Sequence, residues 1–541
     1  MIKYNFHNVI IFLFKNHILC KIFTMKQFTN LFFPSFGSFK GAWNQVSKTS
    51  NSRIRFIDFL KVTGLLLIIF NTFYFLQFEK SSGEFIIYNR VILDNTLTPI
   101  TWVTVGMSLF IFSTGFTNKI AWYSNVGRDG SQWKFLTDRV DSIMGTVLVW
   151  IFFITLTLNI SSKIIYFPLY ITNQEDGILT VTEFIMWPLW LVSIYLAVVL
   201  FCPLTIFLHK KNPYSTISFL IASLVLIDNI DFSISLSYIK LFNYLIFWLT
   251  VHQLGYFYAD GKIFNFKKRT FAAISLLSYT YLSFLHHSTS EYLSVSNYRL
   301  LSFSNEDPPT TIYLIASVGL ISFLLLLREE IETFMNRQNV WYIFSTIHSN
   351  IYTLFLWHVA VFFFTSYFST PVYLYLLIIF VSIFVFGNYE RKTFRLSRSL
   401  IKRVNPLQPW PTPIKARLSY SNFLLAWISS VLVIIGIFQI TLGGVGLSGF
   451  FSLRQLYIFS GNTFEAFTRI IIGLLLLNVT VRRVDLKNQL LVLAIASQVV
   501  TLLIRFQLYS SITSLELYLG VFLVFFYLIL IFNNRNYKSL V

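Results

Sequence analysis

Two histidines inside apolar blocks are the residues of this chain with the plainest capacity for chemistry. His358 follows Trp357 in one block, and His252 precedes Gln253 in another. A neutral imidazole can take a proton from a hydroxyl group, so either side chain could act as a general base. A histidine with one satisfied ring nitrogen can also sit in a helix bundle without any catalytic duty. Both interpretations stay open on the residue alone.

A charged run opens the first apolar block. Arg53 and Arg55 precede Asp58 and Lys61, which share a helix face because they are three residues apart. Thr72 follows Lys61 by about 11 residues, or about 16 Å along a helix. The basic side chains could snorkel at the inner membrane surface while Asp58 neutralises one of them. Polar groups buried in lipid cost free energy unless paired, which makes them candidates for function. The further polar candidates inside apolar blocks are Asn71, Ser113, Trp190, Asn243, His252 and Gln253.

The elements that position these residues follow from composition. Of the 541 residues, 55% are hydrophobic and 12% are charged, and a soluble domain carries about twice that charged fraction. The apolar residues form blocks near 20 residues long, about the length that crosses a ~30 Å hydrocarbon core. Helices satisfy their own backbone polar groups in lipid. The sequence therefore predicts an all-α, polytopic transmembrane bundle of about 14 spans. We expect these at residues 57–78, 97–116, 141–160, 185–206, 214–230, 239–258, 270–287, 311–328, 348–366, 371–387, 422–442, 466–480, 487–508 and 513–532.

The net charge is +19, and the position of the basic residues along the chain indicates how the chain is oriented in the membrane. Most Lys and Arg residues fall in alternate loops, and the positive-inside rule then places both chain ends in the cytoplasm. No basic stripe lies on a soluble domain, so no nucleic-acid partner is expected. Cys20 and Cys202 are too few for a disulfide framework, and no metal site is expected. The composition points to a cell (plasma or inner) membrane protein in contact with lipid.

Four regions are expected along the chain. Residues 1–52 form a basic, aromatic cytoplasmic segment that could lie on the inner leaflet. Residues 53–388 form a ten-helix unit. Residues 389–420 form a basic, proline-containing cytoplasmic linker, and residues 421–541 form a four-helix tail.

The polar motifs of residues 53–388 together resemble acyltransferase family 3, membrane enzymes that O- or N-acylate sugars, lipids and antibiotics. The resemblance starts with Asp58 and Lys61 and runs in order through the ninth span. Its matching segments are Phe110 to Phe116, Trp133 to Arg139, Trp187 to Trp190 with Tyr195 and Pro203, Phe242 to Tyr244 with Trp248, His252 to Gly255 with Asp260-Gly261, Ser304-Asn305 with Pro308 to Thr310, and Leu356-Trp357-His358. Residues 421–541 resemble no family that we can name.

The resemblance implies a mechanism. Acyl-CoA would bind as co-substrate from the cytoplasm, where basic residues meet its phosphates, and no bound cofactor is implied. An acyl group, most simply acetyl, would pass to a saccharide or lipid-linked acceptor at the outer face. The expected acyl-CoA-binding residues are Arg53, Arg55, Lys61 and Arg139, and the expected catalytic residues are His358, Thr72 and Asp58.

This chain departs from the family pattern in its first span. Lys61 stands at the arginine position, and Thr72 stands where the family has its first-helix histidine. A threonine cannot replace imidazole as a base, and a lysine lacks the planar fork that suits phosphate. Thr114 replaces a serine, and Ser142 replaces a second arginine.

Three functions remain open on the sequence. The first is a working acyltransferase in which His358 or His252 is the base. The second is a catalytically silent member that binds a glycolipid or a protein partner. The third is a transporter or flippase, which would show inverted repeats that this sequence lacks.

Overall fold

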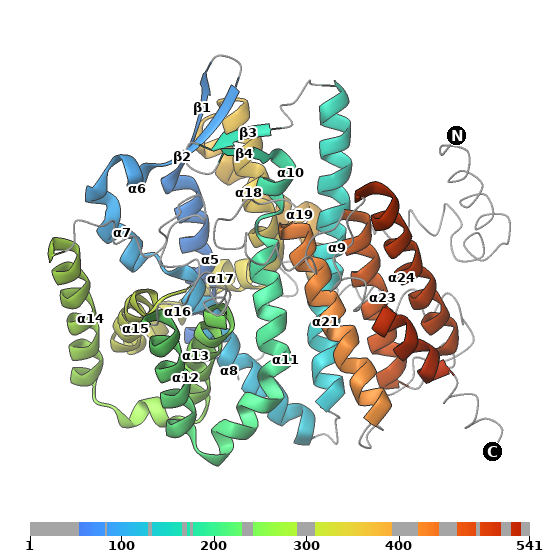
Figure 1. Ribbon diagram of the computed structural model, residues 1–541. Coiled ribbons are helices and arrows are strands. Elements are labelled where there is room, and N and C mark those ends of the chain that lie inside the picture. Colours follow the sequence, from blue (N-terminus) through green and yellow to red (C-terminus); the bar gives the residue numbers. More distant parts are fainter. Residues whose placement is uncertain are drawn as a thin grey trace.

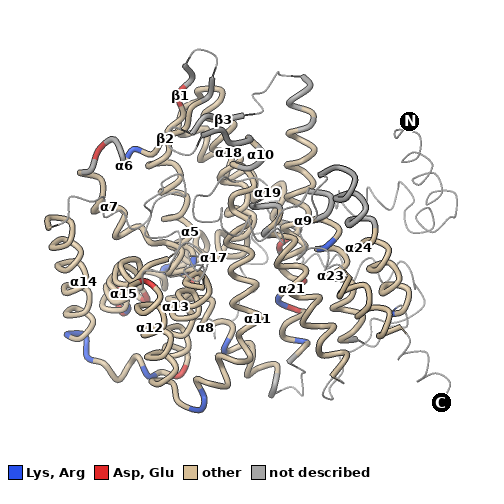
Figure 2. The backbone as a smooth tube through the Cα atoms, in the orientation of Figure 1, with Lys and Arg blue, Asp and Glu red and all other residues tan. Residues whose placement is uncertain are grey.

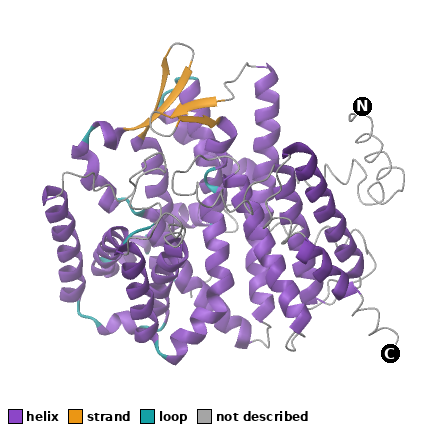
Figure 3. Cartoon of the chain, viewed as in Figure 1, coloured by secondary structure: helices purple, strands orange, loops and turns teal. Residues whose placement is uncertain are grey.

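The computed structural model describes residues 54–81, 84–127, 132–164, 170–173, 177–229, 242–288, 309–391, 420–442, 463–482, 487–509 and 521–531. Helices dominate this part of the chain, and α9, α11 and α21 stand side by side along its length (Figures 1 and 3). A small sheet closes one end. The first predicted region, residues 1–52, lies outside the described residues, as does Arg53.

Every apolar block that the sequence marks as a span contains a helix. The helices are α5 (Arg55–Phe75), α6 (Arg90–Leu93), α7 (Thr98–Val103), α8 (Gly106–Gly127), α9 (Gln132–Ile164), α10 (Val181–Met186), α11 (Leu189–Lys211), α12 (Pro213–Asn229), α13 (Phe242–Ala259), α14 (Lys268–Ser288), α15 (Thr311–Leu326), α16 (Arg328–Met335), α17 (Gln338–His348), α18 (Ile351–Tyr367), α19 (Val372–Arg391), α21 (Tyr420–Leu442), α23 (Thr463–Arg482) and α24 (Lys487–Tyr509). Residues 521–531 are also helical.

Length and composition make several of these helices membrane spans. Among the described residues, five helical segments are long and apolar enough to cross a membrane, and two bent helix pairs raise the number to seven. The bends are 63° between α15 and α16 and 70° between α17 and α18. Shorter apolar helices accompany them. The chain is therefore a multi-pass, helical membrane protein, while about 14 crossings with both ends inside stay a prediction.

A four-stranded sheet that the all-α prediction lacks joins two loops. Its strands are β1 (Leu76–Ser81), β2 (Glu84–Asn89), β3 (Tyr170–Asn173) and β4 (Gly177–Thr180), in the order β1-β2-β3-β4. The β1–β2 and β3–β4 pairs are antiparallel hairpins, and β2 pairs with β3 in parallel. Short extended segments between spans give no helical period, so a search for apolar blocks passes over them.

Charge is distributed unevenly about this sheet. Figure 2 shows basic residues where α11 meets α12 and at the start of α14, at the end of the molecule opposite the sheet. These are Lys210, Lys211 and the segment 267–269. The positive-inside rule would assign that end to the cytoplasm and the sheet to the outer side, and the orientation stays a prediction.

Helix α8 lies between α5 and α13, and glycines set both crossings. A Cβ atom added at Gly106 would lie 2.3 Å from the carbonyl oxygen of Gly64 on α5. A Cβ atom added at Gly115 would lie 2.1 Å from the carbonyl oxygen of His252 on α13. The backbones therefore approach as closely as glycine alone permits, in the manner of small-residue contacts between membrane helices.

Gly115→Ala is expected to destabilise the protein by about 3 kcal/mol, because a backbone rather than a flexible side chain blocks the added methyl group. The decrease should appear as a lower midpoint of thermal unfolding in detergent. Gly319→Ala is the matched control with a smaller expected loss, because its added Cβ would lie 2.9 Å from Cβ of Ser278, against 2.1 Å from a backbone carbonyl oxygen at Gly115. Equal losses in the two variants would contradict the tight α8–α13 crossing.

Candidate functional site

Helices α5 and α18 lie side by side and bring the first-span residues close to the ninth-span histidine. The rings of Phe73 on α5 and Phe362 on α18 are 6.2 Å apart. His358 precedes Phe362 by four residues, so it occupies the same face of α18 one turn nearer to the helix start. Thr72 precedes Phe73 directly. The structure thus places His358 and Thr72 within about one helical turn of one another along the bundle.

His358 has the hydrogen-bond arrangement of a fixed tautomer. The side chain is fully buried, and its Nδ1–H donates to the carbonyl oxygen of Phe355 one turn earlier. With the proton on Nδ1, the Nε2 atom carries a lone pair. In the described part of the chain Nε2 has no hydrogen-bond partner. A general base requires an oriented ring with such an available lone pair.

Thr72 and Ser113 are both fully buried and serve their own helices. The Thr72 hydroxyl donates to the carbonyl of Ile68 at 3.1 Å, and the Ser113 hydroxyl donates to the carbonyl of Leu109 at 2.8 Å. Asn71 acts between helices, because its Nδ2 donates to the carbonyl of Thr104 at 2.9 Å, in the break between α7 and α8. This bond supplies the donor that the broken helix lacks at that position.

Asp58 bonds across the bundle rather than remaining at a surface. Its Oδ1 lies 3.1 Å from Nε2 of His348, the last residue of α17, and its side chain is 6% exposed. Lys61, three residues later, lies over the ring of Phe110 on α8 at 5.3 Å. Both residues are buried, so simple snorkelling of Lys61 to the membrane surface does not describe its position.

Glu390, which the sequence analysis overlooked, caps the helix that carries His358. Its carboxylate accepts hydrogen bonds from the backbone N–H groups of Tyr352 and Thr353 at 3.0 and 2.8 Å, and from the Thr353 hydroxyl at 2.8 Å. The first backbone N–H groups of a helix need acceptors, and here the acceptor comes from the end of α19. Glu390 therefore fixes the start of α18, two turns before His358.

The second candidate base, His252, contacts a different set of helices. Its Nε2 lies 3.1 Å from Nδ2 of Asn118 on α8, and the side chain is fully buried. Its Nδ1 has no partner among the described residues. Gln253, the next residue, donates instead to Nδ1 of His209 on α11 at 2.6 Å. His252 is thus held at one nitrogen and available at the other, whichever way the Asn118 amide is oriented.

Three other predicted residues lie on α9, α11 and α13. Arg139 of α9 donates to the carbonyl of Thr117 at 3.3 Å and is close enough to His252 for its charge to act on that ring. Trp190 contacts the ring of Trp248 at 6.4 Å, and Asn243 is buried near the start of α13. Trp190 and Asn243 are buried, whereas Arg139 is half-buried. The structure does not gather them at a single point with His358.

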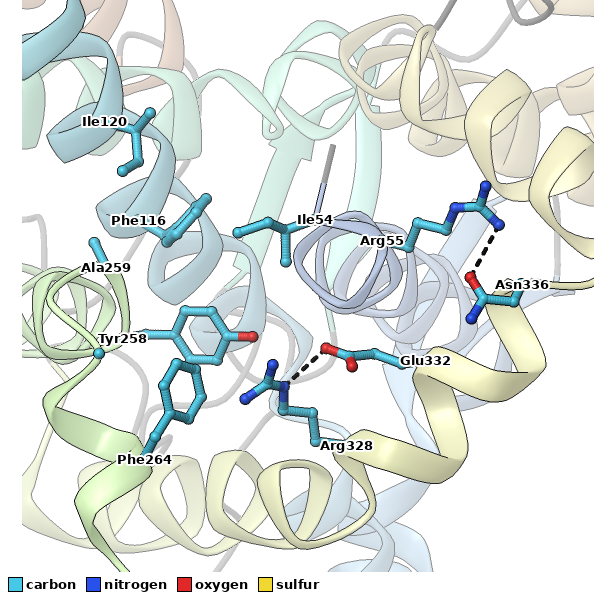
Figure 4. Close-up of a pocket in the computed structure, with 11 residues that line it drawn as sticks. Ile54, Arg55, Phe116, Ile120, Tyr258, Ala259, Phe264, Arg328, Glu332 and Asn336 are labelled. Atoms are coloured by element: carbon cyan, nitrogen blue, oxygen red, sulfur yellow. Dashed lines mark hydrogen bonds and ion pairs between the residues drawn. The ribbon is translucent and has the colours of Figure 1, made fainter. Parts of the chain in front are cut away.

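A pocket of about 550 Å³ opens at the start of α5 (Figure 4). Of the predicted site residues Arg55 lines it, while His358 and Thr72 are not in its wall. Arg55 points toward α16 and donates to the carbonyl of Met335 and to Oδ1 of Asn336 at 3.0 and 3.2 Å. The pocket lies at the end that the positive-inside rule assigns to the cytoplasm.

Arg328 is the pocket cation that the sequence analysis did not select. Its guanidinium lies 4.1 Å from the ring centre of Phe264 and 5.6 Å from that of Tyr258. Its Nε donates to Glu332 at 2.8 Å, as Figure 4 shows. Because Nε is the atom used, the two terminal nitrogens keep donors for an anion, and the aromatic rings limit the motion of the guanidinium. In the sequence Arg328 is one of several basic residues in a loop that marks topology.

A clamp formed by the partly exposed Asp260 and two buried partner side chains holds the wall of this pocket. Asp260, between the lining residues Ala259 and Gly261, bonds Lys119 of α8 at 2.5 Å and His209 of α11 at 2.9 Å. Both partner side chains are 2% exposed. The clamp joins α8, α11 and the end of α13, and its two buried partners could not be identified from spacing.

The fold and these sites define a class, a helical membrane protein with a buried histidine and an aromatic, basic pocket at one membrane surface. An acyltransferase domain model matches residues 54–387, which is more than half of the chain. The chain therefore belongs to acyltransferase family 3, as its motifs predict. Neither a curated protein nor a solved structure matches it.

Proposed function

We propose that the protein transfers an acyl group, most simply acetyl, from cytoplasmic acyl-CoA to a saccharide or lipid-linked acceptor at the outer face of a cell membrane. The observation that carries the proposal is the match of the acyltransferase domain to residues 54–387. The buried histidine with an available Nε2 lone pair supplies the base that such a transfer needs. His358 on α18 then replaces the first-helix histidine that this chain lacks.

The basic, aromatic pocket is the proposed entry for the donor. Acyl-CoA carries phosphates and an aromatic base, and Arg328, Tyr258 and Phe264 offer cationic and aromatic partners for them. A volume of about 550 Å³ suits part of such a ligand. Arg55 at the pocket precedes Phe73 by 18 residues on α5, or about 27 Å, and His358 lies about one turn before Phe362, which contacts Phe73. This leaves about 21 Å between the pocket and the base. An extended pantetheine arm would bridge this distance and bring the thioester to the base.

In the proposed reaction Nε2 of His358 takes the proton of an acceptor hydroxyl while the oxygen attacks the thioester carbonyl. The carbon–oxygen bond forms, the carbon–sulfur bond breaks, and the proton goes on to the released CoA thiolate. His252 is the second candidate base, because one of its ring nitrogens is also available. The silent-member hypothesis instead predicts acceptor binding without transfer.

Arg328→Gln is expected to raise the KM for acyl-CoA about 10- to 100-fold with little change in kcat, because it removes a charge-assisted contact to phosphate. The assay follows label from acyl-CoA into membrane glycolipids of the native host, using purified protein in lipid nanodiscs. Arg337→Gln is the matched control, since Arg337 is not in the pocket wall. Equal effects of the two variants would remove the pocket from the donor path.

Transfer by the wild-type protein would establish the enzyme, and its absence would favour the silent member. In that case Thr72→His should be added to the same assay. A variant that then transfers label would show that the donor and acceptor sites are intact and that this chain lacks the base. Failure of the wild-type protein to transfer any label from acyl-CoA would overturn the proposed function, whichever result Thr72→His gives.

A further inference from the structure

A buried hydrogen bond joins the C-terminal helices to the acyltransferase domain. Asn478 of α23 donates from Nδ2 to Oδ1 of Asp141 on α9 at 3.3 Å, and also to the carbonyl of Leu474 at 3.1 Å. Asp141 is 3% exposed and Asn478 is fully buried. The two residues are separated by 337 positions in the chain. Polar side chains buried at this depth in a helix bundle are functional candidates, because leaving them in lipid is costly.

The helix that carries Asn478 is itself held firmly. An added Cβ atom would lie 2.8 Å from the Ala466 carbonyl at Gly436, and 2.7 Å from the Ser429 carbonyl at Gly473, so α21 and α23 cross backbone to backbone. Apolar residues of both helices, such as Val433 and Leu477, belong to the same core as those of the acyltransferase helices. Figure 1 shows α21 beside α11 and α9. The tail helices therefore offer α9 a rigid surface.

Arg139 lies on the opposite side of α9 from this bond. Residues two apart in a helix are separated by about 200° around its axis. Accordingly Arg139 donates to the Thr117 carbonyl on α8, whereas Asp141 accepts from α23. At this level α9 is held between α8 on one side and α23 on the other. A shift of α23 would be transmitted to Arg139 through a single turn of helix.

We propose that α21 and α23 form a fixed second part of the acyltransferase unit, in which Asn478 positions Arg139 by holding Asp141. Arg139 does not line the pocket, but it bonds the carbonyl of Thr117, which follows the lining residue Phe116. Its role as a donor-binding residue rests on the proposed function. The family match ends at residue 387, and Asn478 lies beyond it. The tail thereby has a defined role, because Asn478 donates a hydrogen bond to a buried carboxylate of α9 and so helps to set the position of Arg139 along the bundle.

An exchange of the two residues tests the proposal in the full-length protein. Asp141→Asn weakens the bond because it replaces the carboxylate by a neutral acceptor, and Asn478→Asp breaks it by placing two carboxylates together. Combined, the two changes restore an amide facing a carboxylate with the donor on α9. We expect each single variant to raise the KM for acyl-CoA about ten-fold, with a smaller change in kcat, and the double variant to recover most of the loss. Ser429→Ala, a buried tail change away from α9, is the control and should leave the KM unchanged.

Thermal unfolding of the wild-type protein, the two single variants and the double variant separates this proposal from the proposed function. A melting temperature that recovers in the double variant supports the α9–α23 bond even if no acceptor is turned over. Independent, additive losses in both melting temperature and KM would overturn the bond as a coupling element. Recovery of the melting temperature while every variant keeps the wild-type KM would overturn the positioning of Arg139.

Discussion

His358→Gln lowers the kcat of acyl transfer by about 10²- to 10⁴-fold in our account, the usual contribution of a positioned general base. Glutamine keeps the approximate size of the ring and a polar end, but it cannot take up a proton at neutral pH. The KM for acyl-CoA should change little, because His358 lies away from the donor pocket. Initial rates at saturating acyl-CoA measure the effect.

Two companion variants make this result specific. His287→Gln, at an exposed histidine whose Nδ1 bonds the Ser283 carbonyl, should retain wild-type activity. His252→Gln should reduce kcat less than His358→Gln, unless the base lies on α13. If His252→Gln abolishes transfer while His358→Gln retains it, the base is His252, and the assignment to α18 is wrong.

Asp260→Ala has the largest expected effect on stability, about 3 kcal/mol lost. It leaves Lys119 and His209 buried without the carboxylate that both contact, and an uncompensated buried charge typically costs about 3 to 5 kcal/mol. The lower end applies because the Asp260 side chain is 27% exposed. Thermal unfolding in detergent measures the loss. Lys119→Met in the same chain should restore part of it, and a double variant no more stable than Asp260→Ala would contradict the clamp.

The clamp also makes stability depend on pH. Burial alone would raise the pKa of Asp260, but the hydrogen bonds from Lys119 and His209 outweigh it and hold the pKa below the ordinary 3.8. A carboxyl with a lowered pKa stabilises the fold above its unfolded value and loses that contribution as the pH falls through its folded value. The wild-type melting temperature should therefore exceed that of Asp260→Ala by a constant amount at neutral pH. The difference should shrink below about pH 4.

Helix positions could be read from the sequence because lipid demands them. Apolar blocks near 20 residues gave a helix at each expected range, and small residues such as Gly115 mark where helices cross. The sheet from β1 to β4 could not be predicted this way, since its short strands lie in loops and pair across a long stretch of chain. The bends at α15–α16 and α17–α18 were not predicted, because the length of an apolar block does not give the direction of its helix.

Candidate site residues could be selected from the sequence where they belong to a motif. Residues whose role depends on neighbours distant in the chain could not be selected in this way. His358, Arg55 and Lys61 follow from motif positions, and the structure places them in the bundle or at the pocket. Arg328 was overlooked because it is a candidate only through the two aromatic rings beside it. Glu390 was overlooked because it is a candidate only through its hydrogen bonds to the start of α18. The fold brings these residues together, although they are far apart in the sequence.

Release of free CoA thiol tests the central claim, that this chain is an acyl-CoA-dependent membrane acyltransferase, most directly. Purified wild-type protein in lipid nanodiscs is incubated with acetyl-CoA and membrane glycolipids from the native host, and thiol and glycolipid mass are followed together. Our account predicts acceptor-dependent thiol release matched one to one by acetylated glycolipid. A folded, monodisperse protein that releases no thiol, or releases it without any acetylated product, would contradict it.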